Sequence, residues 1–334
     1  MISEIDLIRR IRGQVLPGGA GVIKGIGDDC AVVAPKGGGT VTLVTTDTLV
    51  EGVHFDLSWH PPELLGQKAV AVNVSDIAAM GGIPRYALLS LAAPATIDTV
   101  LLERLMQGFM AALARQQVIL IGGDTVKSDQ GLVLTVTILG EAVREQVLYR
   151  SGAKPWEQVW VSGPLGQAAA GLEICKQGHA ALSASSPELV QAHLDPQAEV
   201  ALGPILAASG LVTAMIDLSD GLATDLAHLC AESGVGAMVT AEALPISTAT
   251  RQAAETLGLD PLRLAIAGGE DYRLLFTAPL AATKKLQALA HHAVGGAIFR
   301  IGEIGAGQGV LLRQQGEPGR MISFQGYDHF REQR

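Results

Sequence analysis

One segment, PPELLGQKAVAVNVSDIAAMGG at residues 61–82, restricts the fold more than any other part of the chain. It opens on two prolines and closes on two glycines, residues typical of the start and the end of a helix. Between these ends the side chains are apolar nearly all round the helix, as in helices that other elements cover on every side. The sequence therefore predicts a helix buried inside a folded domain.

This apolar helix carries a carboxylate. Asp76 and Asn73 are three residues apart and therefore share one face. An unpaired carboxylate in a protein core costs several kcal/mol, so Asp76 needs a cation or several hydrogen-bond donors. Lys68 lies about two turns away along the helix and is not an obvious partner. A metal ion is the simplest answer.

The same pattern recurs along the chain, with acidic residues at the ends of apolar segments and Gly, Ser or Thr beside them. Taken singly, each has an ordinary explanation, because Asp before a helix is usually an N-cap and Gly-Asp is usually a turn. Together they would supply many hard oxygen ligands, which suit Mg²⁺ or Ca²⁺, and Mg²⁺ commonly completes its shell with substrate phosphates. The six segments are GIGDDC with Asp28 and Asp29, TTDT with Asp47, NVSD with Asp76, IGGDT with Asp124, IDLSDG with Asp217 and Asp220, and AGGEDY with Glu270 and Asp271.

Several familiar nucleotide-binding signatures are absent. The chain contains no GxxxxGK[ST] P-loop and neither the HRD nor the DFG motif of protein kinases. GPLGQAAAG at residues 163–171 has some likeness to a phosphate loop, but close helix packing explains it better. Phosphate is therefore expected to be held through metal ions, assisted by glycine-rich backbone and by Arg150. His54 follows Asp47 by seven residues and could face the same cleft.

The composition narrows the class of protein. The 334 residues suffice for two domains, and 48% are hydrophobic while 17% are charged, which describes a compact folded chain. A net charge of −9 argues against nucleic acid as a partner. The longest apolar run contains Asn73 and Asp76 and is too short to span a bilayer, and the amphipathic N-terminal segment is not a signal peptide. We therefore expect a cytoplasmic protein, with Cys30, Cys175 and Cys230 as buried free thiols.

Strands and helices follow one another without a strict βαβ rhythm, which favours an α+β fold. A boundary falls near residues 149–163, YRSGAKPWEQVWVSG, a loop followed by a short new strand. We accordingly divide the chain into domains at 1–148 and 149–334. Strands are predicted at 41–47, 85–93, 131–143, 212–216, 236–240, 272–277 and 298–302, and helices at 61–82, 97–117, 166–177 and 222–233.

In this order the motifs resemble those of the thiamine-monophosphate kinase family. The match runs from GIGDDCAV through TTDTLVEGVHF, KAVAVNVSDIAAMGG, LIGGDT, RSGAKP, IDLSDGL and GGEDYRLLF to GYDHF at residues 326–330. The family belongs to the superfamily of aminoimidazole ribonucleotide synthetase, whose fold is called PurM-like. The resemblance implies a two-domain α+β fold. Its N-terminal domain would bind ATP and Mg²⁺ and pair its mixed sheet with a second copy in a dimeric β-barrel, while an α/β sandwich-like C-terminal domain would complete the active-site cleft.

The resemblance also implies an activity, the ATP-dependent phosphorylation of thiamine monophosphate to thiamine diphosphate, the last step in making that cofactor. Several Mg²⁺ ions would bridge two anionic substrates in an acidic protein and support direct in-line transfer of the γ-phosphoryl group. The chemistry would rest on the metal ligands Asp47 and Asp124. No general base is required, because the acceptor phosphate is already ionised near neutral pH. The implied partners are thiamine monophosphate, ATP and a second copy of the chain, with no nucleic acid and no membrane.

The residues that match the family's functional positions fall into three groups. The group resembling magnesium ligands contains Asp29, Thr45, Thr46, Asp47, Asp76, Asp124, Asp217 and Asp220. The group resembling nucleotide contacts contains Gly123, Asp124, Arg150 and Ser219, and the group on the thiamine-phosphate side contains His54, Glu270 and Tyr327. The chain departs from the family pattern at Trp156, where a glycine is common, and at Gln197, where the family usually has an arginine. These departures would alter a turn and a contact between the domains.

Two other functions stay open. One is another ATP-dependent synthetase of the superfamily, such as a ring-closing purine enzyme, which single residues do not exclude. Members that activate amides or selenide use a cysteine near a terminus, and this chain has none there. The other is a non-enzymatic divalent-ion-binding module, which would bind metal tightly without hydrolysing ATP. Hydroxyls and an arginine among the carboxylates suit a nucleotide site better than such a module.

Overall fold

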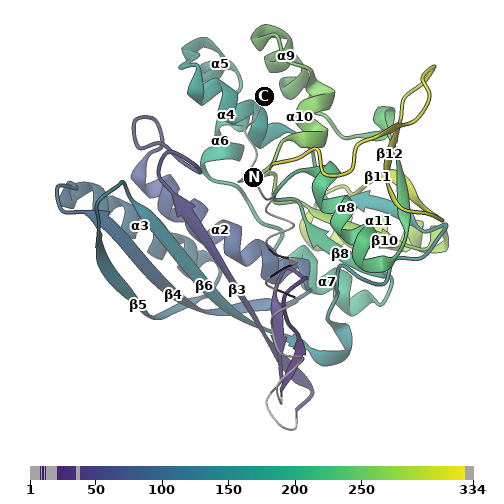
Figure 1. Cartoon of the computed structure of the whole chain (residues 1–334), viewed down its shortest axis with the longest axis horizontal. Helices are drawn as coiled ribbons and strands as arrows, with labels where there is room; N and C mark the ends of the chain where they lie inside the picture. Colours follow the sequence, from purple (N-terminus) through teal and green to yellow (C-terminus); the bar gives the residue numbers. More distant parts are fainter. Residues whose placement is uncertain (1–7, 9, 11, 13–20, 35–37, 328–334) are drawn as a thin grey trace.

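The computed structural model describes residues 8, 10, 12, 21–34 and 38–327, which form two lobes, each built on its own β-sheet (Figure 1). The predicted amphipathic N-terminal segment lies mostly outside the described residues. Both lobes mix strands and helices, which confirms the α+β class and its two-domain form. None of the described helices has both the length and the apolar character needed to cross a membrane.

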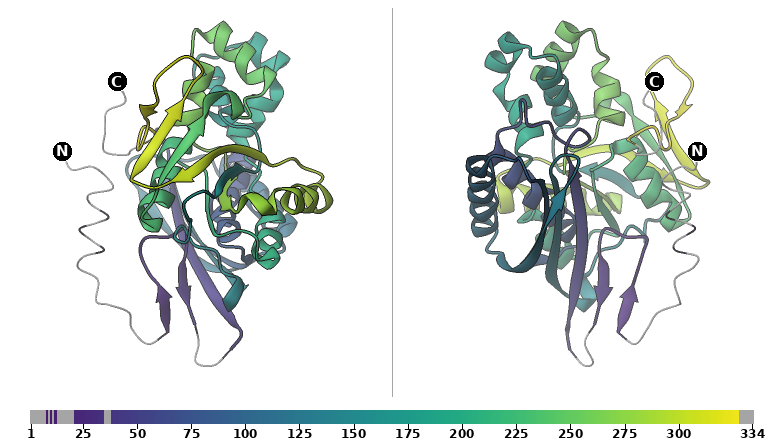
Figure 2. Two further views of the ribbon diagram at one scale, coloured as in Figure 1. Left: turned by 90° about the vertical axis from the view of Figure 1, so that its right-hand side faces the viewer. Right: turned by 60° about the vertical axis from the view of Figure 1, so that its left-hand side comes forward.

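The first sheet has six strands in the order β1-β2-β3-β6-β4-β5. Only β4 and β5 run parallel, and all other neighbours are antiparallel. Helices α2 (Pro62–Ala79) and α3 (Thr99–Arg115) lie along one face of this sheet (Figures 1 and 2). The strands are β1 (Val22–Lys24), β2 (Ala31–Val33), β3 (Thr40–Val50), β4 (Ile83–Pro94), β5 (Ile119–Ser128) and β6 (Val133–Val143).

The packing of α2 against α3 explains why the predicted helix at 61–82 is buried. Gly66 of α2 lies so close to α3 that a Cβ atom there would come within 2.2 Å of the Leu105 carbonyl oxygen. Gly108 of α3 is equally tight, since its Cβ would lie 1.9 Å from the Glu63 carbonyl oxygen. These two glycines let the helix backbones touch, and α2 is thereby enclosed between α3 and the sheet.

The second sheet has seven strands in the order β13-β12-β9-β11-β7-β10-β8, with β12 and β9 as its parallel pair. Its strands are β7 (Gln158–Val161), β8 (Ala214–Asp217), β9 (Gly236–Thr240), β10 (Leu274–Ala278), β11 (Phe299–Gly305), β12 (Gly309–Arg313) and β13 (Arg320–Met321). The helices of this lobe are α4 (Gln167–Lys176), α5 (Ala180–Ser185), α6 (Pro187–Leu194), α7 (Leu202–Ser209), α8 (Leu222–Ser233), α9 (Thr248–Leu257), α10 (Pro261–Ala267) and α11 (Thr283–Val294). Short 3₁₀ turns occupy Arg144–Gln146, Ala241–Ala243 and Leu280–Ala282.

Helices cover both faces of the second sheet. On one face Val159 and Val161 pack with α8, and on the other Trp160 and Phe276 pack with α7 and α11. All four residues of β7 and of β8 are therefore buried. Strands enclosed on both faces are expected to be apolar throughout rather than alternating, which explains why these short apolar runs could be predicted.

The two lobes meet at the C-terminal end of α2. Ala79 belongs to the same apolar cluster as Trp160 and Leu206 of the second lobe. Gly203 of α7 approaches α2 so closely that a Cβ atom there would lie 2.1 Å from the Ala78 carbonyl oxygen. The helix that carries Asp76 is therefore shared by both lobes, and its last turn lies between them.

Several elements differ from the prediction. The strand expected at 41–47 continues to Val50, and the described chain adds strands β1, β2, β5, β12 and β13 that no predicted range covers. Within the described residues the first sheet is open, with β1 and β5 at its edges. The β-barrel shared by two copies stays a prediction.

Candidate active site

Three carboxylates from distant parts of the chain meet between the lobes. Asp29 precedes β2, Asp76 lies on α2 and Asp217 ends β8, and one oxygen from each lies within 4.8 Å of the others. Asp29 and Asp217 are buried and Asp76 is half-buried. Among the described residues, no other set of three acidic, histidine or cysteine side chains comes this close. We refer to these three residues, with the adjacent Asp47, as the acidic cluster.

Hydroxyl groups orient two members of the acidic cluster. Thr45 Oγ1 on β3 donates a short hydrogen bond to Asp76 Oδ2. Ser75 Oγ on α2 donates to Asp217 Oδ2 at 2.6 Å, across the junction between the lobes. These bonds fix one oxygen of each carboxylate and leave the other available to a ligand.

Arg150 holds the Asp28–Asp29 turn. Its Nη2 donates to Asp29 Oδ1 at 2.8 Å, and its backbone N–H donates to Asp28 Oδ1 at 3.0 Å. Lys24 Nζ lies 3.1 Å from Asp28 Oδ2. The second oxygen of Asp29, Oδ2, is buried and accepts no hydrogen bond from any residue that the structure describes. A buried carboxylate oxygen without a donor is the position that a cation would fill.

Electrostatics in the acidic cluster are unbalanced. Asn73 Oδ1 accepts the backbone N–H of Asp47 at 3.1 Å and so holds Asp47 beside α2. Burial, followed by repulsion from Asp29, raises the pKa of Asp47 to about 6. Burial and the neighbouring carboxylates raise the pKa values of Asp76 and Asp217 well above their usual range. Among the described residues, the four carboxylates of the acidic cluster thus lie beside a single arginine, Arg150.

The donor set fits magnesium. Mg²⁺ binds oxygen at about 2.0–2.1 Å, so two ligands of one ion lie about 3–4 Å apart. The 4.8 Å limit on the oxygens of the acidic cluster is close to this spacing. Carboxylate and hydroxyl oxygens are also the ligands that this hard cation prefers. Asp29, Asp47, Asp76 and Asp217, with Thr45, would hold it.

Two predicted metal ligands do not join the acidic cluster within one chain. Thr46 lies on the opposite face of β3 from Thr45 and Asp47, where its Oγ1 donates to the Val136 carbonyl at 3.1 Å. Asp124 and the adjacent Gly123 lie on the edge strand β5 and are exposed. Three strand spacings separate β5 from β3, a distance of about 14 Å.

The loop after β8 brings together four more of the predicted residues, Ser219, Asp220, Glu270 and Tyr327. Glu270 N–H donates to the Ser219 carbonyl at 2.7 Å, and Tyr327 N–H donates to the Asp220 carbonyl at 3.1 Å. The backbone N–H of Asp220 donates to Asp225 Oδ2 at 3.2 Å. Sequence reasoning missed Asp225, a buried carboxylate in the first turn of α8, whose position in an apolar helix was the available signal.

The segment between β3 and α2 carries His54. His54 lies in the turn after β3, where its Nδ1 accepts the backbone N–H of Val50 at 3.0 Å. It is half-buried. The shared cleft expected for His54 and Asp47 stays a prediction.

Glu270 forms a second charged cluster with residues that the sequence did not predict. Lys68 Nζ of α2 lies 2.8 Å from Glu270 Oε1 and 2.9 Å from Oε2, and His193 Nδ1 of α6 lies 2.9 Å from Oε2. Lys68 is fully buried and His193 is 1% exposed. Burial favours protonation of Glu270, but Lys68 and His193 outweigh it and hold its pKa below the usual range. The available signal was a lysine within an otherwise apolar helix.

The GGEDY loop that carries Glu270 has an unusual backbone. Glu270 and Tyr272 have φ values of 65° and 47°, in the left-handed region that residues with a side chain seldom adopt. Between them, Asp271 accepts the backbone N–H groups of Gly166 at 2.7 Å and Ala168 at 3.2 Å. Asp271 thus caps the N-terminus of α4, where a phosphate loop would bind phosphate. The preference for helix packing over a phosphate loop at 163–171 agrees with this contact.

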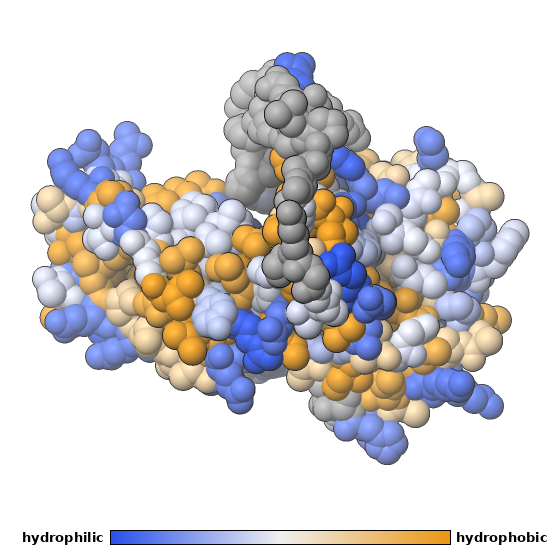
Figure 3. Space-filling model, turned by 90° about the horizontal axis from the view of Figure 1, so that it is seen from below, coloured by the Kyte–Doolittle hydropathy of each residue, from blue (hydrophilic) through white to orange (hydrophobic). Residues whose placement is uncertain are grey.

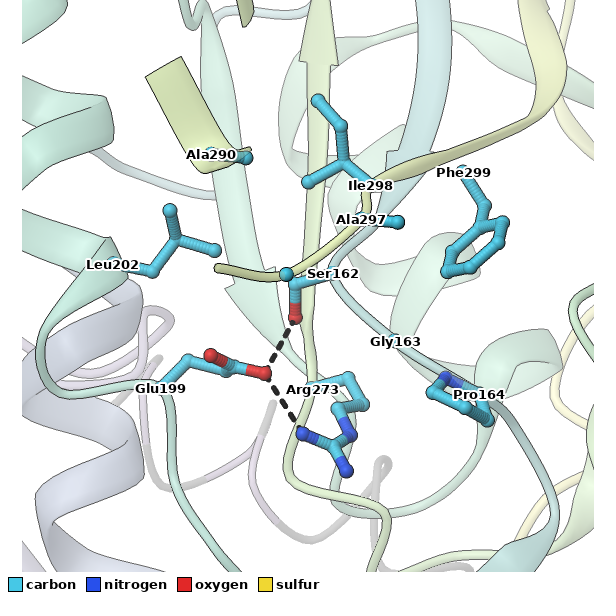
Figure 4. A pocket seen from close by; sticks show the side chains of 11 residues that line it. Ser162, Gly163, Pro164, Glu199, Leu202, Arg273, Ala290, Ala297, Ile298 and Phe299 are labelled. Carbon is cyan, nitrogen blue, oxygen red and sulfur yellow. Dashed lines mark hydrogen bonds and ion pairs between the residues drawn. The ribbon is translucent and has the colours of Figure 1, made fainter. Parts of the chain in front are cut away.

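A cavity of about 360 Å³ lies elsewhere in the second lobe (Figure 4). At its lower edge Glu199 Oε1 accepts hydrogen bonds from Ser162 Oγ at 3.3 Å and from Arg273 Nη1 at 2.8 Å. Leu202, Ile298 and other apolar side chains form the opposite wall. No predicted site residue lines this cavity, so it is separate from the acidic cluster.

The two departures from the family pattern have local consequences. Trp156 is 74% exposed and has a φ of 75°. Gln197 Nε2 donates to the Asp195 carbonyl at 2.9 Å. A contact between the lobes is made at this point by Arg115 of α3, whose Nη2 lies 3.9 Å from Asp195 Oδ1.

Family models match both lobes. "AIR synthase related protein, N-terminal domain" matches residues 27–142, and "AIR synthase related protein, C-terminal domain" matches residues 157–313. The fold and the site therefore define a two-domain protein related to AIR synthase.

Individual relatives specify the family. The chain is 37% identical to the thiamine-monophosphate kinase of Escherichia coli K12 over 98% of both chains. A solved structure described as "AaThiL complexed with AMPPCP and TMP" superposes with a TM-score of 0.83, at 34% identity over 98% of this chain and 97% of that one. The thiamine-monophosphate kinase of Stenotrophomonas maltophilia K279a gives a TM-score of 0.76 at 38% identity over 94% and 96%. The chain belongs to the thiamine-monophosphate kinase family.

Proposed function

We propose that the chain transfers the γ-phosphoryl group of ATP to the phosphate of thiamine monophosphate, giving thiamine diphosphate and ADP. The observation that carries this proposal is the acidic cluster, which gathers four carboxylates at the junction of the lobes beside Arg150. The E. coli relative is a thiamine-monophosphate kinase, and the "AaThiL" structure holds AMPPCP and TMP, which supports both substrates.

Each group of residues in the site has its own role. Asp29, Asp76 and Asp217, with Asp47 and Thr45, hold several Mg²⁺ ions, which when bound neutralise the phosphates of both substrates. Arg150 adds a fixed positive charge, because Asp29 and Asp28 outweigh burial and raise its pKa. Ser219 contacts the nucleotide, and Asp220 is a further metal ligand. His54, Glu270 and Tyr327 hold the thiamine phosphate.

In the transfer reaction the side chains hold the substrates in position and do not exchange protons with them. An oxygen of the acceptor phosphate forms the new bond to the γ-phosphorus while the bond to the departing ADP oxygen breaks in line with it. The acceptor oxygen is ionised near neutral pH, so no proton has to be removed and no side chain serves as general base. The reaction takes place in the cytoplasm, where the free thiols of Cys30, Cys175 and Cys230 remain reduced.

A homodimer completes this proposal, with 1–148 as the pairing domain and 149–334 closing the cleft. The face of the first sheet away from α2 and α3 exposes apolar side chains, among them Tyr86 (46% exposed), Ile119 (61%) and Ile121 (54%). Figure 3 shows apolar side chains among polar ones on the side of the first sheet. A second copy covering this face would bury them. It would also bring Gly123 and Asp124 of edge strand β5 to the site of the second copy.

Asp124 allows a direct test of the shared site. Asp124→Asn and Asp217→Asn dimers are each expected to be inactive. Mixed and allowed to exchange subunits, they would form dimers in which one of the two sites is intact, and about a quarter of the wild-type rate should return. If mixing restores nothing although subunits exchange, Asp124 and Asp217 act in the same site of one chain or Asp124 is no ligand.

The function itself is tested by following both products. Purified chain with Mg²⁺, ATP and thiamine monophosphate should release ADP and thiamine diphosphate in equal amounts. Thiamine serves as the control that lacks the acceptor phosphate. ADP release with formylglycinamidine ribonucleotide instead would assign the chain to the ring-closing synthetases, and tight metal binding without any turnover would assign it to the binding modules.

A further inference from the structure

In the Lys68–Glu270–His193 cluster, two side chains from different lobes contact the carboxylate of Glu270. We propose that Lys68 and His193 are positioning residues that fix the Glu270 carboxylate as an acceptor for one N–H donor of the aminopyrimidine ring of the substrate. This inference rests on the proposed function and adds two residues to its substrate side, neither of which was predicted from the sequence.

The geometry leaves one acceptor position free on Glu270. A carboxylate offers about four lone-pair positions, two on each oxygen. Lys68 Nζ uses one on each oxygen, at 2.8 and 2.9 Å. His193 Nδ1 lies 2.9 Å from Oε2 and occupies the space beside that oxygen. Among the described residues, the second position on Oε1 has no donor. A single hydrogen-bond donor from a ligand would fill the remaining acceptor position of the carboxylate.

The surroundings keep this carboxylate from moving. Lys68 is fully buried on α2, His193 is 1% exposed, and the Trp59 ring packs against the His193 ring at 5.6 Å between centroids. The backbone of Glu270 is itself held, since its N–H donates to the Ser219 carbonyl at 2.7 Å. Three elements from both lobes therefore determine where Oε1 lies.

The charges are balanced within the cluster. Burial, together with the charge of Lys68, lowers the pKa of His193, which therefore stays neutral at neutral pH. The positive charge of Lys68 then cancels the negative charge of Glu270. Glu270 thus needs no metal ion and does not compete with the acidic cluster for Mg²⁺.

The spacing along α2 suits a small molecule with a ring at one end and a phosphate at the other. Lys68 and Asp76 are eight residues apart on the same helix, which corresponds to about 12 Å along its axis. Tyr272 joins the two ends through the backbone, because it lies two residues after Glu270 and its N–H donates to the carbonyl of Leu218, the residue after Asp217, at 2.8 Å. A substrate whose phosphate meets the acidic cluster can therefore present its ring to Glu270.

The rival explanation is that Lys68 and Glu270 form only an ion pair that joins the lobes. The two explanations differ in which ligand is affected. A joining ion pair would change stability and both substrates alike, whereas a positioning role affects thiamine monophosphate alone.

The test compares substrate constants in matched variants. Lys68→Met should raise the KM for thiamine monophosphate by about 10- to 100-fold, the usual range for a charged hydrogen bond, and leave the KM for ATP within about twofold. Lys68→Arg should recover part of the loss. Arg115→Met removes another contact between the lobes, at Asp195, and serves as the control with both KM values unchanged.

A pair of histidine variants keeps the inference testable if Lys68→Met does not fold. His193→Gln removes the group at the Nδ1 position, whereas His193→Asn keeps an amide N–H there. The KM for thiamine monophosphate should rise about tenfold in the first and stay near the wild-type value in the second. Calorimetric binding of thiamine monophosphate gives the same comparison without turnover, so failure of phosphoryl transfer alone does not decide it. Equal changes for both substrates, or no change in any of these variants, would overturn the inference.

Discussion

The acidic cluster and the Lys68–Glu270–His193 cluster lie about two turns apart on α2. Their surroundings nevertheless shift the pKa values of their carboxylates in opposite directions. In the acidic cluster burial and like charges raise the pKa values of Asp76 and Asp217. At Glu270 the charge of Lys68 and the contact with His193 hold the pKa low against burial. The first cluster gathers four carboxylates beside Arg150, whereas the charges of Lys68 and Glu270 cancel in the second.

This difference shows how one helix can serve both ends of a substrate. Under the proposed function, the unbalanced end would bind Mg²⁺ and, through it, phosphate. The balanced end offers a fixed acceptor that no metal ion displaces. Removing a carboxylate should therefore abolish chemistry at one end and weaken recognition at the other.

The largest effect is expected from Asp217→Asn, which should lower kcat by about a thousandfold or more because a metal ligand is lost. Asp47→Asn should lower kcat by a similar factor. Glu270→Gln should mainly raise the KM for thiamine monophosphate, which separates the two clusters kinetically. Asp98→Asn, at the exposed N-cap of α3, is the control. Near-normal kcat of Asp217→Asn at saturating Mg²⁺ would remove the distinction between the clusters.

Asp271 provides a third case, a half-buried carboxylate that accepts hydrogen bonds from backbone N–H groups. Burial raises its pKa to about 6 despite the N–H groups of Gly166 and Ala168. The folded state then binds a proton that the unfolded state has lost between pH 4 and 6, so this group lowers the free energy of unfolding as pH rises through that window. Relative to Asp271→Asn, which does not titrate, the wild type should lose up to about 3 kcal/mol. Urea unfolding at several pH values measures the difference, and a rise with pH would contradict it.

Mg²⁺ should stabilise the protein only through the acidic cluster. Binding at a hundredfold excess over Kd adds about 2.7 kcal/mol, which corresponds to a rise in Tm of about 5 °C. Glu270→Gln should keep this rise, and Asp76→Asn should lose most of it. Calorimetric scans without nucleotide give the three shifts. A full rise in Asp76→Asn would place the cation elsewhere.

The smallest effect is expected at Trp156, whose left-handed backbone lies outside both clusters. Trp156→Gly removes a conformational cost of about 1 kcal/mol, partly offset by the greater freedom of glycine in the unfolded chain. The free energy of unfolding should change by less than about 1 kcal/mol, with kcat unaltered. In contrast to the similar backbone of Glu270 and Tyr272, this strain would then be unrelated to the site. A loss of activity in Trp156→Gly would connect it to the chemistry.

Each carboxylate of the acidic cluster had its own local signal in the sequence. Asp29, Asp76 and Asp217 each stand where an apolar segment meets polar or glycine residues, and the structure brings all three together. The alternation of side chains along β3 could also have separated Thr46 from Thr45. The position of Asp124 depends on the strand order of the sheet, which no local pattern indicates.

The second cluster could not be predicted for a physical reason. Lys68 and Glu270 are separated by 202 residues, and their pairing depends on how the two lobes pack. A lysine in an apolar helix indicates a buried partner but does not identify it. Helices α5, α6, α7 and α9 to α11 escaped prediction as well, because most are short and offer only about two or three turns of repeating pattern.

The most direct test of the account is a crystal structure with AMPPCP, thiamine monophosphate and Mn²⁺ in place of Mg²⁺. The anomalous signal of Mn²⁺ should appear between Asp29, Asp76 and Asp217, in contact with phosphate oxygens, and not at Glu270. Absence of any Mn²⁺ peak among these three carboxylates at saturating metal and nucleotide would contradict the central claim.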